Sequence, residues 1–194
     1  LLESVVDPAR ETLGQIRSLR ETGDGSVLVA SARGVFRIAE PRAMPQPLVN
    51  GRVLDAHDAV EAFDGSVWVA TDSDGVWRID PDGALRRVLH PVDGLPDAAI
   101  RSLMFDRSGR LWIGSQSGLS RWDPNGSTLQ SWPGDTSSSG DALSSPRVEE
   151  LFEDRDGLLW VGTWFNGVNL HDPRTEAFAT ARPVEANTLS LPAR

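Results

Sequence analysis

The 194-residue chain contains no cysteine, and all 19 of its basic residues are arginine. Without cysteine there is no disulfide framework and no Cys/His zinc pattern, and the absence fits the periplasm and the cytosol equally. No apolar run approaches the roughly 18 residues that a bilayer-spanning helix needs. The formal net charge is -9 and no basic stripe occurs, which excludes nucleic acid as a partner.

What the chain does contain is one phrase repeated four times. Its glycines are spaced 40, 44 and 48 residues apart, and such a period is typical of stacked or radial repeats. The four copies span residues 24–31, 64–71, 108–115 and 156–163, with the glycines at Gly25, Gly65, Gly109 and Gly157.

Each copy predicts short strands separated by tight turns. Runs such as Val67-Trp68-Val69 are β-branched and aromatic, which suits a pleated, packed surface. The Asp-Gly steps favour hairpins, because glycine tolerates positive φ. Apolar segments before and after the phrase add further strands, which we place at 100–105, 148–152, 85–89, 129–132 and 177–181.

Four short antiparallel strands per repeat predict an all-β chain of β-propeller blades. We place about four blades, at roughly 12–50, 51–94, 95–142 and 143–186. Residues 187–194 have the pattern that leads into another repeat. Only residues 1–20 have a weak helical pattern.

The third and fourth copies resemble the two-component regulator propeller repeat. The resemblance is carried by the segments 94–100, 101–115 and 118–124 and by 142–148, 153–163 and 167–173. The second copy matches from Asp64 to Pro81, and the first has Leu28 in place of the tryptophan.

The resemblance implies a periplasmic sensor segment of an inner-membrane protein. Members of that family carry seven-bladed propellers, followed by a membrane helix and a histidine kinase or diguanylate cyclase output module. The resemblance therefore implies a non-catalytic segment, a dimeric full-length protein, and a small-molecule or glycan ligand of unknown identity.

Four blades are about half of a seven-bladed ring, so we expect a fragment of such a propeller. An open arc exposes sheet faces and backbone edges, which predicts self-association through them. The alternative is a self-contained four-bladed ring, against which the repeat-like pattern of 187–194 argues.

The candidate ligand site lies in the loops expected to rim one mouth of the central channel. Trp164 and Phe165 are adjacent aromatic residues in a turn, where they can stack on a ligand or pack on a neighbouring blade or on a second chain. The full set of candidates is Trp164, Phe165, Asn166, Asp72, Asp74, Gln116 and Arg147.

Catalysis and metal binding find less support. Asp97, Glu149, Glu150 and His171 are available as acids or bases, but no spacing selects a pair. The segments 72–75 and 154–157 resemble parts of a calcium loop but lack its bidentate glutamate, so we interpret their aspartates as capping their own turns. We predict no cofactor and no metal. A lyase-like propeller enzyme and a pure interaction scaffold remain the alternatives.

The repeated tryptophans Trp68, Trp112 and Trp160 are predicted to pack between blades. His171 stands where Ile79 and Trp122 stand in other copies, which predicts a core position.

Overall fold

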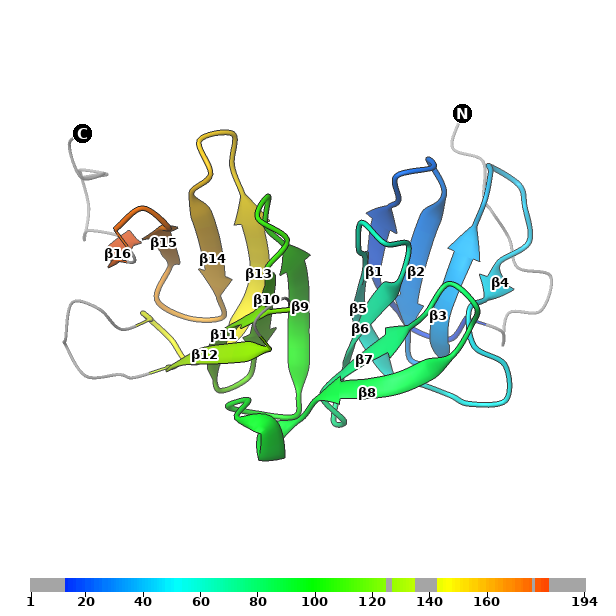
Figure 1. Ribbon diagram of the computed structural model, residues 1–194, viewed down its shortest axis with the longest axis horizontal. Helices are drawn as coiled ribbons and strands as arrows, with labels where there is room; N and C mark the ends of the chain where they lie inside the picture. The colour runs from blue at the N-terminus through cyan, green and yellow to red at the C-terminus, as the bar shows by residue number, and fades with distance from the viewer. Residues whose placement is uncertain (1–12, 125–126, 135–142, 176, 182–194) are drawn as a thin grey trace.

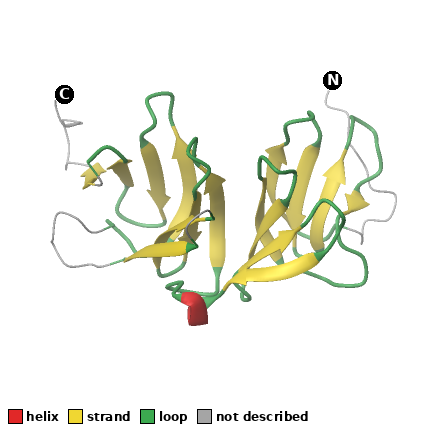
Figure 2. Ribbon diagram, viewed as in Figure 1, coloured by secondary structure: helices red, strands yellow, loops and turns green. Residues whose placement is uncertain are grey.

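The computed structural model describes residues 13–124, 127–134, 143–175 and 177–181. These residues form four antiparallel sheets of four strands each and one 3-10 turn, η1 (Pro91–Asp93) (Figure 2). Each sheet is one blade of a β-propeller, and the predicted all-β fold is confirmed. We number the sheets blades 1 to 4 in chain order.

In each blade the chain passes from the innermost strand to the outermost one. Blade 1 consists of β1 (Ile16–Glu21), β2 (Val27–Ser31), β3 (Gly34–Ile38) and β4 (Gln46–Pro47). Blade 2 consists of β5 (Ala56–Glu61), β6 (Val67–Thr71), β7 (Val76–Ile79) and β8 (Leu85–Leu89). Blade 3 consists of β9 (Ile100–Phe105), β10 (Leu111–Ser115), β11 (Gly118–Asp123) and β12 (Thr128–Pro133). Blade 4 consists of β13 (Val148–Glu153), β14 (Leu159–Thr163), β15 (Val168–Asp172) and β16 (Ala177–Ala181).

The repeated phrase forms the turn between the first two strands and the second strand itself. Gly25, Gly65, Gly109 and Gly157 all have φ near +80°, between 77° and 81°, which explains the glycine in every copy. At the other end of the second strand, a hydroxyl closes the next turn by donating to a glycine carbonyl. The donors are Ser31, Thr71, Ser115 and Thr163.

The hydrophobic core consists of three clusters, and each lies between two consecutive blades. Trp68 and Trp112 are 3% and 1% exposed and belong to two of these clusters. The prediction that they pack between blades is therefore confirmed. His171 is fully buried against Trp112, Trp132 and Phe178, so its predicted core position is also confirmed.

The innermost strands β1, β5, β9 and β13 contact one another in chain order. Blades 1 and 2 lie on one side of Figure 1 and blades 3 and 4 on the other, and the inner strands face the gap between them. The side chains of Arg20 on β1 and Glu150 on β13 meet at 2.9 Å, which joins the first and last blades across the channel.

The weak helical pattern of residues 1–20 is a wrong prediction where the structure describes it. Residues 16–21 form β1, because pairing with β2 along five registered positions outweighs a weak local preference. The strands of each sheet fall within one predicted blade range. Residues 1–12 and the segment 187–194 lie outside the described residues.

Candidate functional site

The channel is lined by the four inner strands, and each carries a β-bulge at its second residue. The register of every inner strand shifts at this position, between its first and third residues. A bulge re-aims the side chain of the extra residue. The four bulged residues are Arg17, His57, Arg101 and Glu149.

A second repeated feature joins the turns to the inner strands. In each blade, the residue after the second strand donates its N–H to the carbonyl of the residue two positions before the bulge. The four pairs are Ala32 to Gln15, Asp72 to Asp55, Gln116 to Ala99 and Trp164 to Arg147, at 2.9–3.1 Å. Asp72, Gln116 and Trp164 therefore occupy equivalent places around one mouth of the channel, and Arg147 lies beside Trp164 as its partner.

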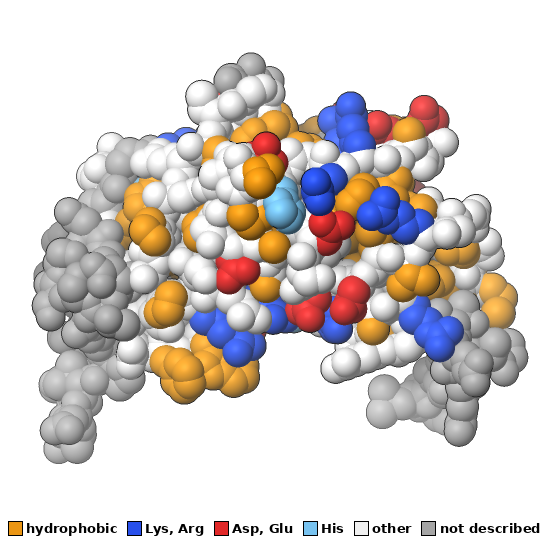
Figure 3. All heavy atoms as spheres, turned by 90° about the horizontal axis from the view of Figure 1, so that it is seen from below, with side chains coloured by type: hydrophobic (Ala, Val, Ile, Leu, Met, Phe, Trp, Pro, Cys, Tyr) orange, Lys and Arg blue, Asp and Glu red, His pale blue; other side chains and the backbone are white. Residues whose placement is uncertain are grey.

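Figure 1 shows β9 and β13 running upward, so the view from below in Figure 3 looks onto the end where the inner strands begin. Arginine and acidic side chains gather near the middle of this face, next to a histidine and among hydrophobic side chains (Figure 3). Although the chain as a whole is acidic, this mouth therefore carries both positive and negative side chains.

Trp164 and Phe165 project from the β14–β15 turn. They are 53% and 65% exposed, and their rings meet edge to face with centroids 6.1 Å apart. The Arg147 guanidinium lies 4.1 Å from the Trp164 ring centroid and also pairs with Glu149. An exposed indole held by a cation and flanked by a carboxylate can stack on a planar or apolar ligand face while polar groups bind its edge.

Asn166 has a structural role in the same turn. Its φ of 68° lies in the left-handed region, where asparagine is favoured over most residues. Its amide donates to the Ser144 carbonyl at 3.1 Å. Asn166 therefore shapes the turn that presents the aromatic pair.

Of the three remaining candidates, two lie at the mouth and one does not. Asp72 pairs with the bulged Arg101 at 2.6 Å and belongs to the mouth. Gln116 is exposed at the mouth in the equivalent turn. Asp74 instead pairs with Arg87 of the outermost strand at 2.8 Å, which turns it away from the inner strands.

His57, Arg17 and Arg101 are functional candidates that spacing alone did not reveal. His57 Nδ1 lies 3.0 Å from the Arg101 carbonyl, so a proton on Nδ1 is donated to that oxygen. Burial and the positive charge of Arg101 lower the pKa of His57, which favours the neutral imidazole. Arg17, His57 and Arg101 stand at equivalent positions of three repeats, and an alignment of the repeats could have identified them.

Asp58, which follows the bulged His57 on β5, connects three blades. Its carboxylate is 2% exposed and accepts hydrogen bonds from the Ser18 hydroxyl at 2.6 Å and the Leu103 N–H at 3.0 Å. Arg20 donates two further bonds to it, at 3.1 and 3.3 Å. Because these donors come from β1 and β9, one carboxylate fixes the spacing of three inner strands.

The opposite mouth of the channel holds a hollow of about 640 Å³. Val60, Met104 and Phe105 line its walls. Phe63 also lines it and is 91% exposed. Carboxylates of Glu21 and Glu153 border it. Sequence reasoning did not identify this hollow, which is formed by turns and strands of several blades.

The groups proposed for acid–base chemistry have separate partners. His171 is enclosed in the core between blades 3 and 4, whereas Glu150 pairs with Arg20 at the channel. Burial alone would raise the pKa of Asp97, but hydrogen bonds from the Ala99 N–H and the Ser117 hydroxyl outweigh it and lower that pKa. A carboxylate with a lowered pKa is a poor general acid near neutral pH.

The segment 154–157, which resembles part of a calcium loop, forms a turn that is capped by the Asp154 side chain. This carboxylate accepts the N–H groups of Asp156 and Leu158 at 2.9 and 3.0 Å, as the turn-capping interpretation predicted. At 72–75 the Thr71 hydroxyl instead accepts the Asp74 N–H at 2.9 Å, while Asp72 and Asp74 pair with arginines. The described residues contain no cluster of three His, Cys, Asp or Glu side chains arranged to hold a metal ion. The part of the chain that the structure covers also has no helix long and apolar enough to cross a membrane.

Comparison with known proteins confirms the resemblance at the repeats themselves. Residues 94–117 and 142–165 match the family described as two component regulator propeller. These segments contain β9–β10 and β13–β14, including the bulges and the Trp164 turn. No curated protein sequence matches the chain.

Solved structures share the fold at low sequence identity. The extracellular domain of a proposed one component system from B. thetaiotaomicron superposes with a TM-score of 0.72 at 18% identity. It covers 93% of this chain, and the chain spans 23% of that protein. The extracellular domain of a proposed hybrid two component system from the same organism gives 0.71 at 20% identity, covering 86% and 23% of the two chains.

Enzymes share the fold as well. A catalytically inactive virginiamycin B lyase from Staphylococcus aureus, solved with quinupristin, has a TM-score of 0.70 at 14% identity. That alignment covers 93% of this chain and 60% of the lyase. Propeller architecture is therefore common to sensor domains and to enzymes, and the site must discriminate between them.

Proposed function

We propose that this propeller is the ligand-binding, non-catalytic sensor segment of a bacterial transmembrane signalling protein, located in the periplasm. The observation that carries the proposal is the match of two repeats to the two component regulator propeller family. The similarity to extracellular domains of proposed one- and two-component systems supports it. The output is then a histidine kinase or a diguanylate cyclase on the other side of the membrane.

The ligand site is the mouth that carries Trp164 and Phe165. The exposed indole offers a stacking surface, and Arg147, Asp72 and the bulged Arg101 supply charged hydrogen-bonding groups. This combination suits a small molecule with one apolar face and several hydroxyl groups, as a sugar has. A signal requires that the ligand bind one arrangement of two propeller chains more tightly than the other.

Binding is favoured over turnover because Glu149, Glu150 and His171 do not converge on one point. Glu149 pairs with Arg147, Glu150 with Arg20, and His171 is enclosed in the core. Catalysis of the lyase type requires an acid and a base within reach of one substrate.

The test of binding uses Trp164 as both probe and target. The chain is titrated with a panel of neutral and acidic oligosaccharides while tryptophan fluorescence and calorimetric heat are recorded. Trp164→Ala should weaken binding of any hit at least about tenfold, because aromatic anchors dominate such interfaces. Phe63→Ala is the matched control, since Phe63 is an exposed aromatic residue at the opposite mouth.

Two results would contradict this assignment. Loss of binding in Phe63→Ala with full binding in Trp164→Ala would move the site to the hollow. Consumption of quinupristin by the purified chain would show that the chain is an enzyme and not a sensor segment. A lactone substrate such as gluconolactone, tested because gluconolactonases share the propeller fold, would have the same meaning. We expect neither substrate to be consumed.

A further inference from the structure

The three contacts between consecutive blades are built in the same way. The first and fourth residues of each inner strand pack against the second strand of the preceding blade. These residues, at most 2% exposed, are Ala56 and Ala59 in blade 2, Ile100 and Leu103 in blade 3, and Val148 and Leu151 in blade 4. We call this side of a blade its upstream face and the opposite side its downstream face.

Blade 1 presents the same upstream pattern, and no other blade of the described residues packs on it. Its first and fourth inner-strand residues, Ile16 and Leu19, are 49% and 63% exposed. Removing the exposed surface of two such aliphatic side chains from water favours association. The upstream face of blade 1 is therefore an apolar surface whose three equivalents are all covered by another blade.

Blade 4 presents the complementary downstream face. In blade 3, a Cβ added at Gly114 would lie 2.6 Å from Val148 Cγ1, so this glycine makes room for the next inner strand. Gly162 is the equivalent residue of blade 4, and the three described atoms nearest to a Cβ added there all belong to Glu150 of its own blade, at 3.6–3.9 Å. Next to it, Val168 is 37% exposed, whereas its equivalents Val35, Val76 and Leu119 are at most 4% exposed.

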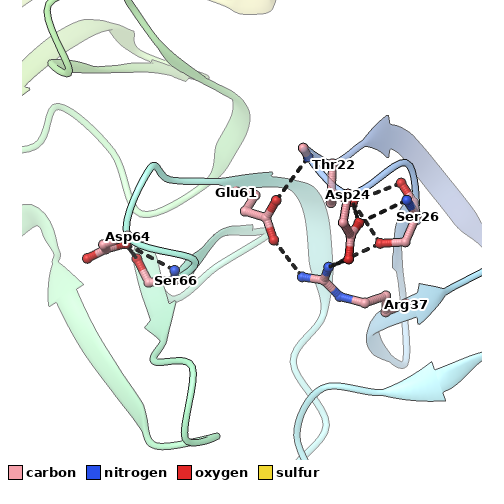
Figure 4. Close-up of polar contacts among 8 residues, drawn as sticks. Thr22, Asp24, Ser26, Arg37, Glu61, Asp64 and Ser66 are labelled. Carbon is pink, nitrogen blue, oxygen red and sulfur yellow. Dashed lines mark hydrogen bonds and ion pairs between the residues drawn. The ribbon is translucent and has the colours of Figure 1, made fainter.

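A polar contact also recurs between blades. The acid at the end of the inner strand accepts an N–H from the turn of the preceding blade: Glu61 from Gly23 at 3.2 Å, and Glu153 from Arg107 at 3.0 Å. Figure 4 shows Glu61 between this turn and Arg37, which donates to it at 2.7 Å. The equivalent acid on blade 1 is Glu21, and the equivalent turn N–H on blade 4 belongs to Arg155; both residues are exposed.

We propose that the downstream face of blade 4 docks on the upstream face of blade 1 of a second copy of this chain. Ile16 of the second copy occupies the space beside Gly162, Leu19 packs on Trp160, and Glu21 accepts the Arg155 N–H. The apolar residues of the two faces repeat those of the three contacts inside the chain, and the Glu21 hydrogen bond repeats the polar contact found in two of them. The interface is head to tail, so each copy retains one free face unless the copies close a ring.

Light scattering of the intact chain over a wide concentration series tests this interface. The weight-average mass should rise above the 21.1 kDa of one chain as concentration increases. Ile16→Asp and Gly162→Val should each hold the mass at one chain, with circular dichroism spectra like that of the wild type. Val92→Asp is the matched control, since Val92 is an 84% exposed apolar residue of η1, between blades 2 and 3.

Mixing the two variants gives the sharpest result. The Ile16→Asp chain keeps its blade 4 face, and the Gly162→Val chain keeps its blade 1 face. An equimolar mixture should therefore form a pair with one chain of each kind, although neither variant associates alone. Should Gly162→Val fail to fold, Val168→Asp takes its place as the blade 4 variant, since Val168 is an exposed apolar residue of the same face. Glu21→Arg is a second blade 1 variant and should weaken wild-type association at least about tenfold.

The proposal is overturned by any of three outcomes. In the first, the wild type stays at the mass of one chain at every concentration. In the second, the wild type associates, and both Ile16→Asp and Glu21→Arg associate equally well. In the third, the mixture of folded variants forms no pair. Each outcome leaves the ligand test at Trp164 unaffected, because the mouth and the two faces use different residues.

Discussion

At the scale of single residues, Asp58 connects β5 to the inner strands of blades 1 and 3. Its carboxylate accepts bonds from Ser18, Arg20 and the Leu103 N–H while only 2% exposed. Replacing one partner of a buried charged network leaves donors without an acceptor, which costs more than the bond itself contributes.

Asp58→Asn should therefore lower the free energy of unfolding by about 2 to 3 kcal/mol. The amide keeps the shape of the carboxylate but replaces one of its two acceptor oxygens with an NH2 group, which then faces donors such as Arg20 and the Leu103 N–H. The matched control is Asp55→Asn, whose partner Arg17 lies at 2.7 Å and whose side chain is 48% exposed. That change should cost less than about 1 kcal/mol. Urea denaturation followed by tryptophan fluorescence measures both, and equal losses would show that Asp58 does not connect the blades.

At the scale of strands, two glycines in equivalent positions have different surroundings. Gly114 of β10 lies against Val148 of the next blade, whereas the described atoms nearest to a Cβ added at Gly162 of β14 belong to its own blade. Gly114→Ala should lower the free energy of unfolding by about 1 to 3 kcal/mol, the usual cost of overpacking. Gly162→Ala should change it by no more than about 0.5 kcal/mol.

The same urea experiment measures this pair of substitutions. Adding Val148→Ala to Gly114→Ala should cost less than the sum of the two single changes, because the second change makes room for the new methyl group. Strict additivity would mean that the two side chains do not meet. Equal effects at Gly114 and Gly162 would mean that the contact between blades 3 and 4 is not tight.

The strands themselves were largely predictable from the sequence. Three strands have the predicted bounds, 85–89, 100–105 and 177–181. They could be predicted because the same pattern of strands recurs in each repeat. β1 was not predicted, since the first copy has a weak leading segment and lacks the tryptophan. Asp72, Gln116 and Trp164 could be placed at one mouth by equivalence, whereas the Asp58 network and the 640 Å³ hollow depend on contacts between distant residues.

At the scale of the whole molecule, stability should be distributed unevenly along the arc of blades. In repeat architectures each unit is stabilised by its own fold and by the contacts with its neighbours. Blades 2 and 3 have described clusters on both faces, and blade 4 has one. Trp68 and Trp112 are accordingly buried at 3% and 1% exposure, whereas the equivalent Trp160 is only partly buried.

Native-state hydrogen exchange should therefore show β14 opening more readily than β6 and β10, although all three are central strands paired on both sides. In dilute protein we expect the amides of β14 to exchange at least about tenfold faster, because opening blade 4 breaks one blade contact and opening blade 2 or 3 breaks two. The comparison of these three strands controls for hydrogen bonding, since their ladders are equivalent. If blade 4 docks on a second copy, the difference should shrink as protein concentration rises, and it should stay constant in Ile16→Asp. Equal protection of β6, β10 and β14 in dilute protein would mean that the downstream face of blade 4 is already covered, and that the arc is as stable at this end as in its middle.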